Sequence, residues 1–185
     1  MTLVKIKKVP LGQLFAAAYG ALRVETTGVI GGRVIRNNGH SVYIAEVAHA
    51  SQLAYRQPST VSPDFAEENR VGKFFNVIGG FHSHINSRKS RSKYSFRDKA
   101  GVWMSDSDYD YISGNYPQGI EIVIALAPAM RITPLLVAPH HVSGIFTDRG
   151  RHYRVQMGAY YIDYHARKRR AFLDIAARDL ARYLE

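Results

Sequence analysis

The chain of 185 residues contains no cysteine, which excludes disulfide bonds and thiolate metal ligands. A transition-metal site would therefore need histidine and carboxylate ligands. No apolar run approaches the roughly eighteen residues that a membrane span requires. The first residues, "MTLVKIKKVPLG", also lack the continuous apolar core of a signal peptide. We therefore expect a soluble, cytoplasmic protein.

Acidic residues are scarce, with 15 Asp and Glu against 25 Lys and Arg, a net charge of +10. Such an excess suits nucleic acid, an anionic surface or an acidic protein partner. Half of the excess lies in residues 88–99, "RKSRSKYSFRDK", which hold six basic residues and one acid. The length and the hydrophobic content of 46% suit one globular domain over residues 1–185 with its own core.

The pattern of apolar residues predicts an α+β domain built on a mixed sheet. In the first half we expect an edge strand at 4–9 and a helix at 11–23, followed by a hairpin over 26–50 that turns at Asn-Gly. A polar loop at 51–72, with a short helix at 63–71, should then lead to a buried strand at 73–84. In the second half we expect a helix from 105 to 114, strands at 120–128, 132–139 and 153–165, and an amphipathic helix at about 166–184.

Two histidines end the buried strand in "GGFHSH". His82 and His84 are two residues apart, so on a strand their side chains share one face and could bind one metal ion. Alternate histidines at a strand end are also common as surface polar residues. This pair alone does not distinguish the two.

A Ser-x-x-Asp pattern follows in "WMSDSD". Ser105 and Asp108 have the spacing of a capping box at a helix start, and the same spacing could place a catalytic hydroxyl beside a metal ligand. If a metal ion activates water, a further carboxylate must accept the proton. Glu25, before "TTGVIGG", and Glu46, within "VYIAEVAHA", are both candidates, and spacing alone does not choose between them.

Together, "VETTGVIGGRV", "GGFHSH" and "WMSDSD" resemble the JAMM motif of the MPN+ (JAB/Mov34) metalloprotease family. That motif consists of a Glu, a distant His-x-His and a following Ser-x-x-Asp. The resemblance covers roughly residues 2–140 and maps the family's Glu to Glu25, which leaves Glu46 as a structural position. It implies a single MPN/JAB-type domain, with a mixed, largely antiparallel sheet flanked by helices.

The resemblance also implies one Zn²⁺ ion bound by His82, His84 and Asp108, with water as the fourth ligand. Glu25 would be the general base for that water, and Ser105 would donate a hydrogen bond to the oxyanion. The expected activity is deubiquitinase-like: cleavage of isopeptide or peptide bonds at the C-terminus of ubiquitin or a ubiquitin-like protein. Family members often work with a partner subunit, and some are catalytically silent scaffolds.

This chain departs from the family pattern immediately after the second histidine. Ile85 stands where the family usually has Pro, and residues 85–104 form a basic insertion longer than the family's spacing. The insertion is expected to be a surface loop that gates the site, docks an acidic partner through the basic residues of 88–99, or does neither. A basic nucleic-acid-binding protein is the weaker alternative, because no nucleic-acid motif is present.

Overall fold

The computed structural model describes residues 1–22, 24–51, 55–57, 60–62, 65–85, 102, 104 and 106–185. The elements of this part of the chain are β1 (Thr2–Ile6), α1 (Lys8–Gly20), β2 (Thr27–Asn37), β3 (His40–Ala50), β4 (Tyr55–Gln57), β5 (Thr60–Ser62), α2 (Phe65–Gly72), β6 (Asn76–Ile85), α3 (Asp106–Asn115), β7 (Ile120–Pro128), β8 (Leu136–Ala138), β9 (His141–Asp148), β10 (Arg151–Ile162), β11 (Lys168–Arg170), β12 (Phe172–Asp174) and α4 (Ala177–Leu180).

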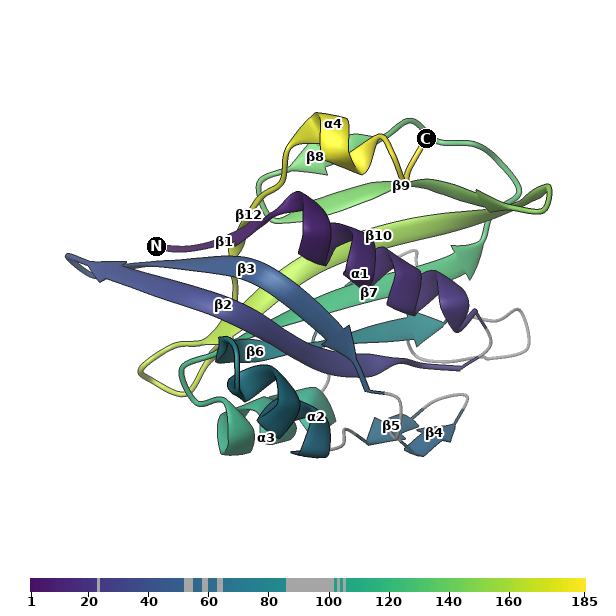
Figure 1. Cartoon of the computed structure of the whole chain (residues 1–185). Helices are drawn as coiled ribbons and strands as arrows, with labels where there is room; N and C mark the ends of the chain where they lie inside the picture. The colour runs from purple at the N-terminus through teal and green to yellow at the C-terminus, as the bar shows by residue number, and fades with distance from the viewer. Residues whose placement is uncertain are drawn as a thin grey trace.

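One mixed sheet forms a nearly closed barrel (Figure 1). Its strand order is β12-β1-β3-β2-β6-β7-β10-β9-β8, β11 pairs with β10 beside this path, and β4 and β5 form a separate hairpin. The two ends of the order approach each other, because the backbone N–H of Leu173 in β12 donates to the carbonyl of Pro139, just after β8, over 2.8 Å. The chain is therefore mostly β.

The expected MPN/JAB-type fold, an α+β sheet flanked by helices, is wrong. The helices of the described residues are few and short, at 13, 8, 10 and 4 residues. The difference arises at β1, which we expected at a sheet edge. β1 pairs in parallel with β3 on one side and with β12 on the other, so the C-terminal segment extends the sheet and brings it towards closure.

The C-terminal helix expected at about 166–184 is also wrong. Its first part forms β11 and β12, and only Ala177–Leu180 is helical. The backbone N–H of Ala171, between the two strands, donates to Ala159 of β10 over 2.9 Å. Ala171 and Ile175 are buried, at 0% and 8% exposure. Hydrogen bonds with β10 and β1 therefore satisfy the backbone N–H and C=O groups that a helix would have satisfied within itself.

Two expectations for the first half of the chain are confirmed. β2 and β3 form the expected hairpin, and its turn residues Asn38 and Gly39 have φ of 46° and 76°, as a turn matched to strand twist requires. Helix α1 also forms. Its buried residues recur at helical spacing and enter the main core: Leu11, Leu14, Phe15 and Ala18.

The two faces of β7 decide where the candidate site lies. Ile120, Ile122 and Ile124 point into the main core, whereas Val123 and Ala125 pack with Ile112 of α3. We call this second side the α3 face of the sheet. β6 runs parallel to β7 with His82 opposite Val123 and His84 opposite Ala125. Both histidines therefore lie on the α3 face.

The basic insertion expected at 85–104, including the cluster at 88–99, lies almost wholly outside the described residues. Its expected role stays a prediction. In the part of the chain that the structure describes, no helix has both the length and the apolar character needed to cross a membrane.

Close packing of β6 on β7 can be tested at Gly79, which has φ of +153°. A Cβ atom there would lie 1.9 Å from the carbonyl oxygen of Ile120. Gly150 is a matched control, because its φ is +75° but a Cβ would meet nothing within 4 Å. We expect Gly150→Ala to cost about 1 kcal/mol of unfolding free energy and Gly79→Ala about 3 kcal/mol or more, measured by urea denaturation. Equal losses would contradict the described strand contact.

Candidate metal centre

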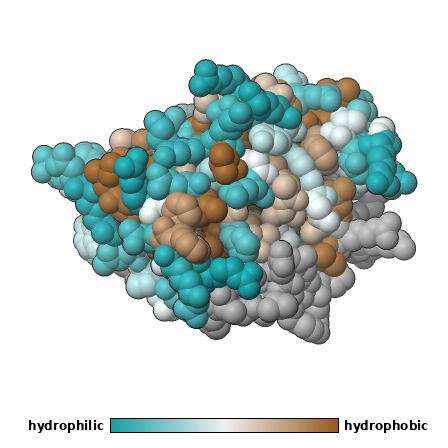
Figure 2. All heavy atoms as spheres, viewed as in Figure 1, coloured by the Kyte–Doolittle hydropathy of each residue, from teal (hydrophilic) through white to brown (hydrophobic). Residues whose placement is uncertain are grey.

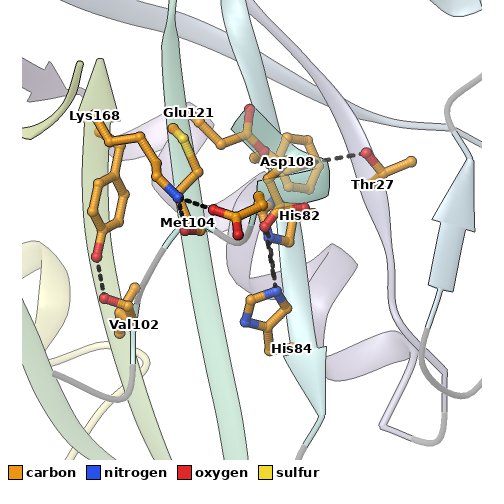
Figure 3. Close-up of polar contacts among 11 residues, drawn as sticks. Thr27, His82, His84, Val102, Met104, Asp108, Glu121 and Lys168 are labelled. Carbon is orange, nitrogen blue, oxygen red and sulfur yellow. Dashed lines mark hydrogen bonds and ion pairs between the residues drawn. The ribbon is translucent and has the colours of Figure 1, made fainter. Parts of the chain in front are cut away.

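Three predicted ligands converge between β6 and α3. His82 and His84 come from the end of β6, and Asp108 comes from the first turn of α3 (Figure 3). The two histidine Nε2 atoms lie 2.9 Å apart. The Asp108 Oδ2 atom lies 3.4 Å from Nε2 of His82 and 4.0 Å from Nε2 of His84. The fold therefore brings together residues that are more than twenty positions apart in the chain.

These donor atoms fit a metal ion. All three ligand atoms lie within 4.8 Å of one another. Zinc bonds of about 2.0–2.1 Å in a tetrahedron place neighbouring donors about 3.3 Å apart, a value within the range observed here. Both histidines are buried, at 5% and 8% exposure, so their nitrogens are shielded from competing water. The His-His-Asp group could thus hold a metal ion.

Glu121, from β7, orients the first histidine. The Nδ1–H of His82 donates to Oε1 of Glu121 over 2.6 Å, and Glu121 is only 3% exposed. This bond directs Nε2 of His82 towards His84 and Asp108. Metal-binding histidines commonly use their second nitrogen in this way, because the carboxylate holds the ring and increases its basicity.

Gly80 makes room for the Glu121 carboxylate. It lies opposite Glu121 in the β6–β7 register, and a Cβ there would come within 2.7 Å of Oε2. The sequence pattern did not single out Glu121, because residues 120–128, "IEIVIALAP", were predicted only as a strand. The available signal was the single charged residue within that apolar run, since carboxylates are rarely fully buried without a partner.

The two histidines differ in protonation. Burial disfavours a charge on His82, but the hydrogen bonds and negative charges of Asp108 and Glu121 outweigh burial and raise its pKa to about 10. Burial, together with the positive charge of His82, lowers the pKa of His84 to about 3. A neutral His84 offers a nitrogen lone pair as a ligand. A metal ion would displace the proton of His82, so metal binding should weaken as pH falls.

Glu25 lies in the segment that leads into β2. The next residue, Thr26, makes two hydrogen bonds with Ser83 of β6. Its N–H donates to the Ser83 hydroxyl over 2.9 Å, and its carbonyl accepts from the Ser83 N–H over 2.8 Å. These bonds hold Glu25 beside the strand that bears both histidines. Burial raises the pKa of Glu25 to about 7, the charge of His82 lowers it, and the charge of Asp108 raises it. Glu25 is therefore electrostatically coupled to the site.

The other carboxylate considered, Glu46, is engaged elsewhere. Its Oε1 atom lies 2.6 Å from the Lys7 ammonium and 3.6 Å from Nε of Arg33. This arrangement agrees with the structural role assigned to Glu46. Ser105 lies outside the described residues, so its role stays a prediction.

Comparisons with known proteins support the fold alone. No protein-family model and no curated protein matches this chain. Among solved structures, the chain is similar to the solution structure of protein DSY2949 from Desulfitobacterium hafniense, with a TM-score of 0.55. The two share 15% sequence identity over 94% of this chain and 92% of the other. At this identity the likeness concerns only the arrangement of the elements.

The role of Glu121 can be tested by Glu121→Gln, which keeps the side-chain size and removes the charge. We expect zinc affinity to fall about tenfold, because His82 keeps an acceptor but becomes less basic. The dissociation constant would be measured by competition with a chromophoric chelator. Glu46→Gln is the matched control, since it removes a carboxylate that is paired with Lys7 and Arg33, and its zinc affinity should equal that of wild type. An unchanged affinity in Glu121→Gln would contradict the orienting role.

The raised pKa of Glu25 makes metal-free stability depend on pH. Its carboxyl ionises near pH 4.5 when unfolded and near pH 7 when folded, so ionisation costs the folded state stability as pH rises through this window. Glu25→Gln cannot ionise. With a chelator present, we expect it to raise the unfolding temperature more at pH 8 than at pH 4, by scanning calorimetry. An equal effect at both pH values would contradict the burial of this carboxyl.

Proposed function

We propose that this protein is a zinc-dependent hydrolase whose metal site consists of His82, His84 and Asp108. The observation that carries the proposal is the convergence of these three donors beside a partly buried carboxyl, Glu25, whose pKa is raised to about 7. A site used only for stability would normally have four protein ligands, whereas three leave a coordination position for water or substrate. The nearby acid–base group favours catalysis over a purely structural ion.

Zinc is the metal that best suits this donor set. Imidazole nitrogen and carboxylate oxygen are both common zinc ligands, and the chain has no thiolates to compete with them. Magnesium and calcium prefer sites built entirely from oxygen, so two imidazoles disfavour them. Zinc can be replaced by cobalt in experiments without changing the ligands, which supplies a visible absorption spectrum.

When bound, the metal lowers the pKa of a coordinated water to about 7 and polarises a carbonyl group. The chain's own residues would supply the remaining steps. Glu25 would accept the proton of the attacking water and transfer it to the leaving amine, a role that suits a carboxyl with a pKa near neutrality. Ser105 would donate a hydrogen bond to the developing oxyanion, which can contribute about 3 kcal/mol of transition-state stabilisation.

The proposed substrates follow from the JAMM-like residues Glu25, His82, His84, Ser105 and Asp108. We propose cleavage of the isopeptide or peptide bond at the C-terminus of ubiquitin or a ubiquitin-like protein. This assignment depends on the motif residues and not on the sheet, because the sheet differs from the one expected for the family. A partner subunit, and an acidic partner at 88–99, belong to the same proposal.

The test combines metal analysis with hydrolysis of a ubiquitin C-terminal fluorogenic amide and of lysine-linked diubiquitin. Wild type should contain about one zinc per chain. Asp108→Ala should contain little, because two histidines alone hold the ion weakly. Glu25→Gln should retain zinc and lose hydrolysis by a factor of about 10² or more.

The outcomes separate the ligand assignment from the activity. Stoichiometric zinc in Asp108→Ala would remove this residue from the ligand set. Zinc-loaded wild type that cleaves neither substrate would contradict the proposed activity and favour a silent scaffold. Glu46→Gln is the control for a general effect of carboxylate loss and should keep both zinc and activity.

A further inference from the structure

Asp108 depends on a different part of the chain from the two histidines. His82 and His84 are fixed by β6, which is paired with β2 and β7 over most of its length. Asp108 lies at the start of α3, and the helix faces the sheet through a small second core that includes Ile112 and Val123. Whatever holds the start of α3 therefore sets the distance from Asp108 to the histidines.

The hairpin of β10 and β11 contacts the chain just before Asp108 at three points. The Tyr160 hydroxyl of β10 donates to the carbonyl of Val102. The Lys168 ammonium of β11 donates to the carbonyl of Met104 over 3.4 Å and to Oδ1 of Asp106 over 2.7 Å. Figure 3 shows Lys168 reaching across towards this segment, beside the candidate metal centre.

A further contact follows Asp108 directly. The Tyr109 hydroxyl donates to the carbonyl of Ala166, in the turn of the same hairpin, over 2.7 Å. The Lys168 ammonium also lies 5.8 Å from the centre of the Tyr109 ring, within range of a cation–π interaction. Asp108 is thus held on both sides, at Asp106 and at Tyr109, by one hairpin.

The hairpin turn is itself braced by Asp163. Its Oδ1 atom accepts the backbone N–H groups of His165 and Arg167, over 2.9 Å and 3.0 Å. Its Oδ2 atom lies 3.0 Å from Nε of both Arg167 and Arg169. These interactions fix the backbone that leads from Ala166 to Lys168. The turn that anchors Asp108 is therefore held by its own hydrogen bonds and ion pairs.

We propose that Lys168 is a positioning residue that sets metal affinity through Asp108. This inference rests on the proposed metal site. Asp106 is almost fully exposed, with 99% of its side chain accessible, so its ion pair with Lys168 contributes little to global stability. Metal bonds, by contrast, tolerate displacements of only about 0.2 Å. Loss of Lys168 should therefore weaken metal binding more than it weakens the fold.

The experiment measures zinc dissociation constants and metal-free unfolding temperatures for Lys168→Met and Lys168→Arg. We expect affinity to fall about tenfold in Lys168→Met, at the lower end for residues that orient ligands, with partial recovery in Lys168→Arg. Lys5→Met is the matched control, because it removes a surface lysine paired with Asp174 at 3.3 Å, on strands β1 and β12. Both methionine variants should unfold at similar temperatures.

A mutant cycle tests whether Lys168 acts through Asp108. In an Asp108→Ala background, Lys168→Met should leave the residual affinity and the cobalt absorption spectrum unchanged. Glu121→Gln acts through His82, so in that background Lys168→Met should lower zinc affinity by the same factor as it does in wild type. A tenfold loss that persists in Asp108→Ala would overturn the positioning role.

Zinc binding by wild type distinguishes a wrong role for Lys168 from a wrong metal site. If wild type binds zinc and Lys168→Met binds it equally well, Lys168 does not position Asp108, while the site stands. If wild type binds no zinc, the proposed function and this inference fall together.

Discussion

The buried hydrogen bond between His82 and Glu121 is the constraint that joins the barrel to the candidate metal centre. It exists only because β6 and β7 run parallel in the register that sets Gly80 opposite Glu121. A shift of one residue would turn His82 and His84 into the main core and leave the carboxylate without its partner. The closely packed glycines of β6 secure that register, so the core geometry of the barrel also determines the site.

Charge explains why such a cluster suits a cation. Asp108 and Glu121 both face His82, at opposite ring nitrogens, so the single positive charge of the protonated ring lies between two carboxylates in a largely buried place. Burial penalises unbalanced charge, so a divalent ion that replaces the proton would compensate the carboxylates better. Val102, Met104 and Ile112 form part of an apolar cluster between α3 and the sheet, which lowers the polarity of the surroundings of these charges. Figure 2 shows that apolar and polar side chains are interspersed over the coloured part of the visible face.

Local patterns predicted those features of the fold and site that depend on residues close together in the sequence. The β2–β3 hairpin followed from Asn-Gly, and the shared face of His82 and His84 followed from strand alternation. Glu121 could have been found from its place in an apolar strand. Lys168 could not, because the helical spacing of the C-terminal residues was mistaken for a helix, and its contacts with Met104 and Asp106 join positions more than sixty residues apart.

The sequence by itself determined which side chains can serve as ligands, since it has no cysteine and carries His-x-His with a later acidic residue. Only the tertiary structure decided that the sheet closes towards a barrel. The parallel pairs of β1 with β3 and β12 are long-range contacts that leave no periodic signal in the chain. Tertiary structure likewise decided that Glu25 lies by the site while Glu46 pairs with Lys7, because spacing in the sequence does not distinguish the two carboxylates, whereas their contacts in the fold do.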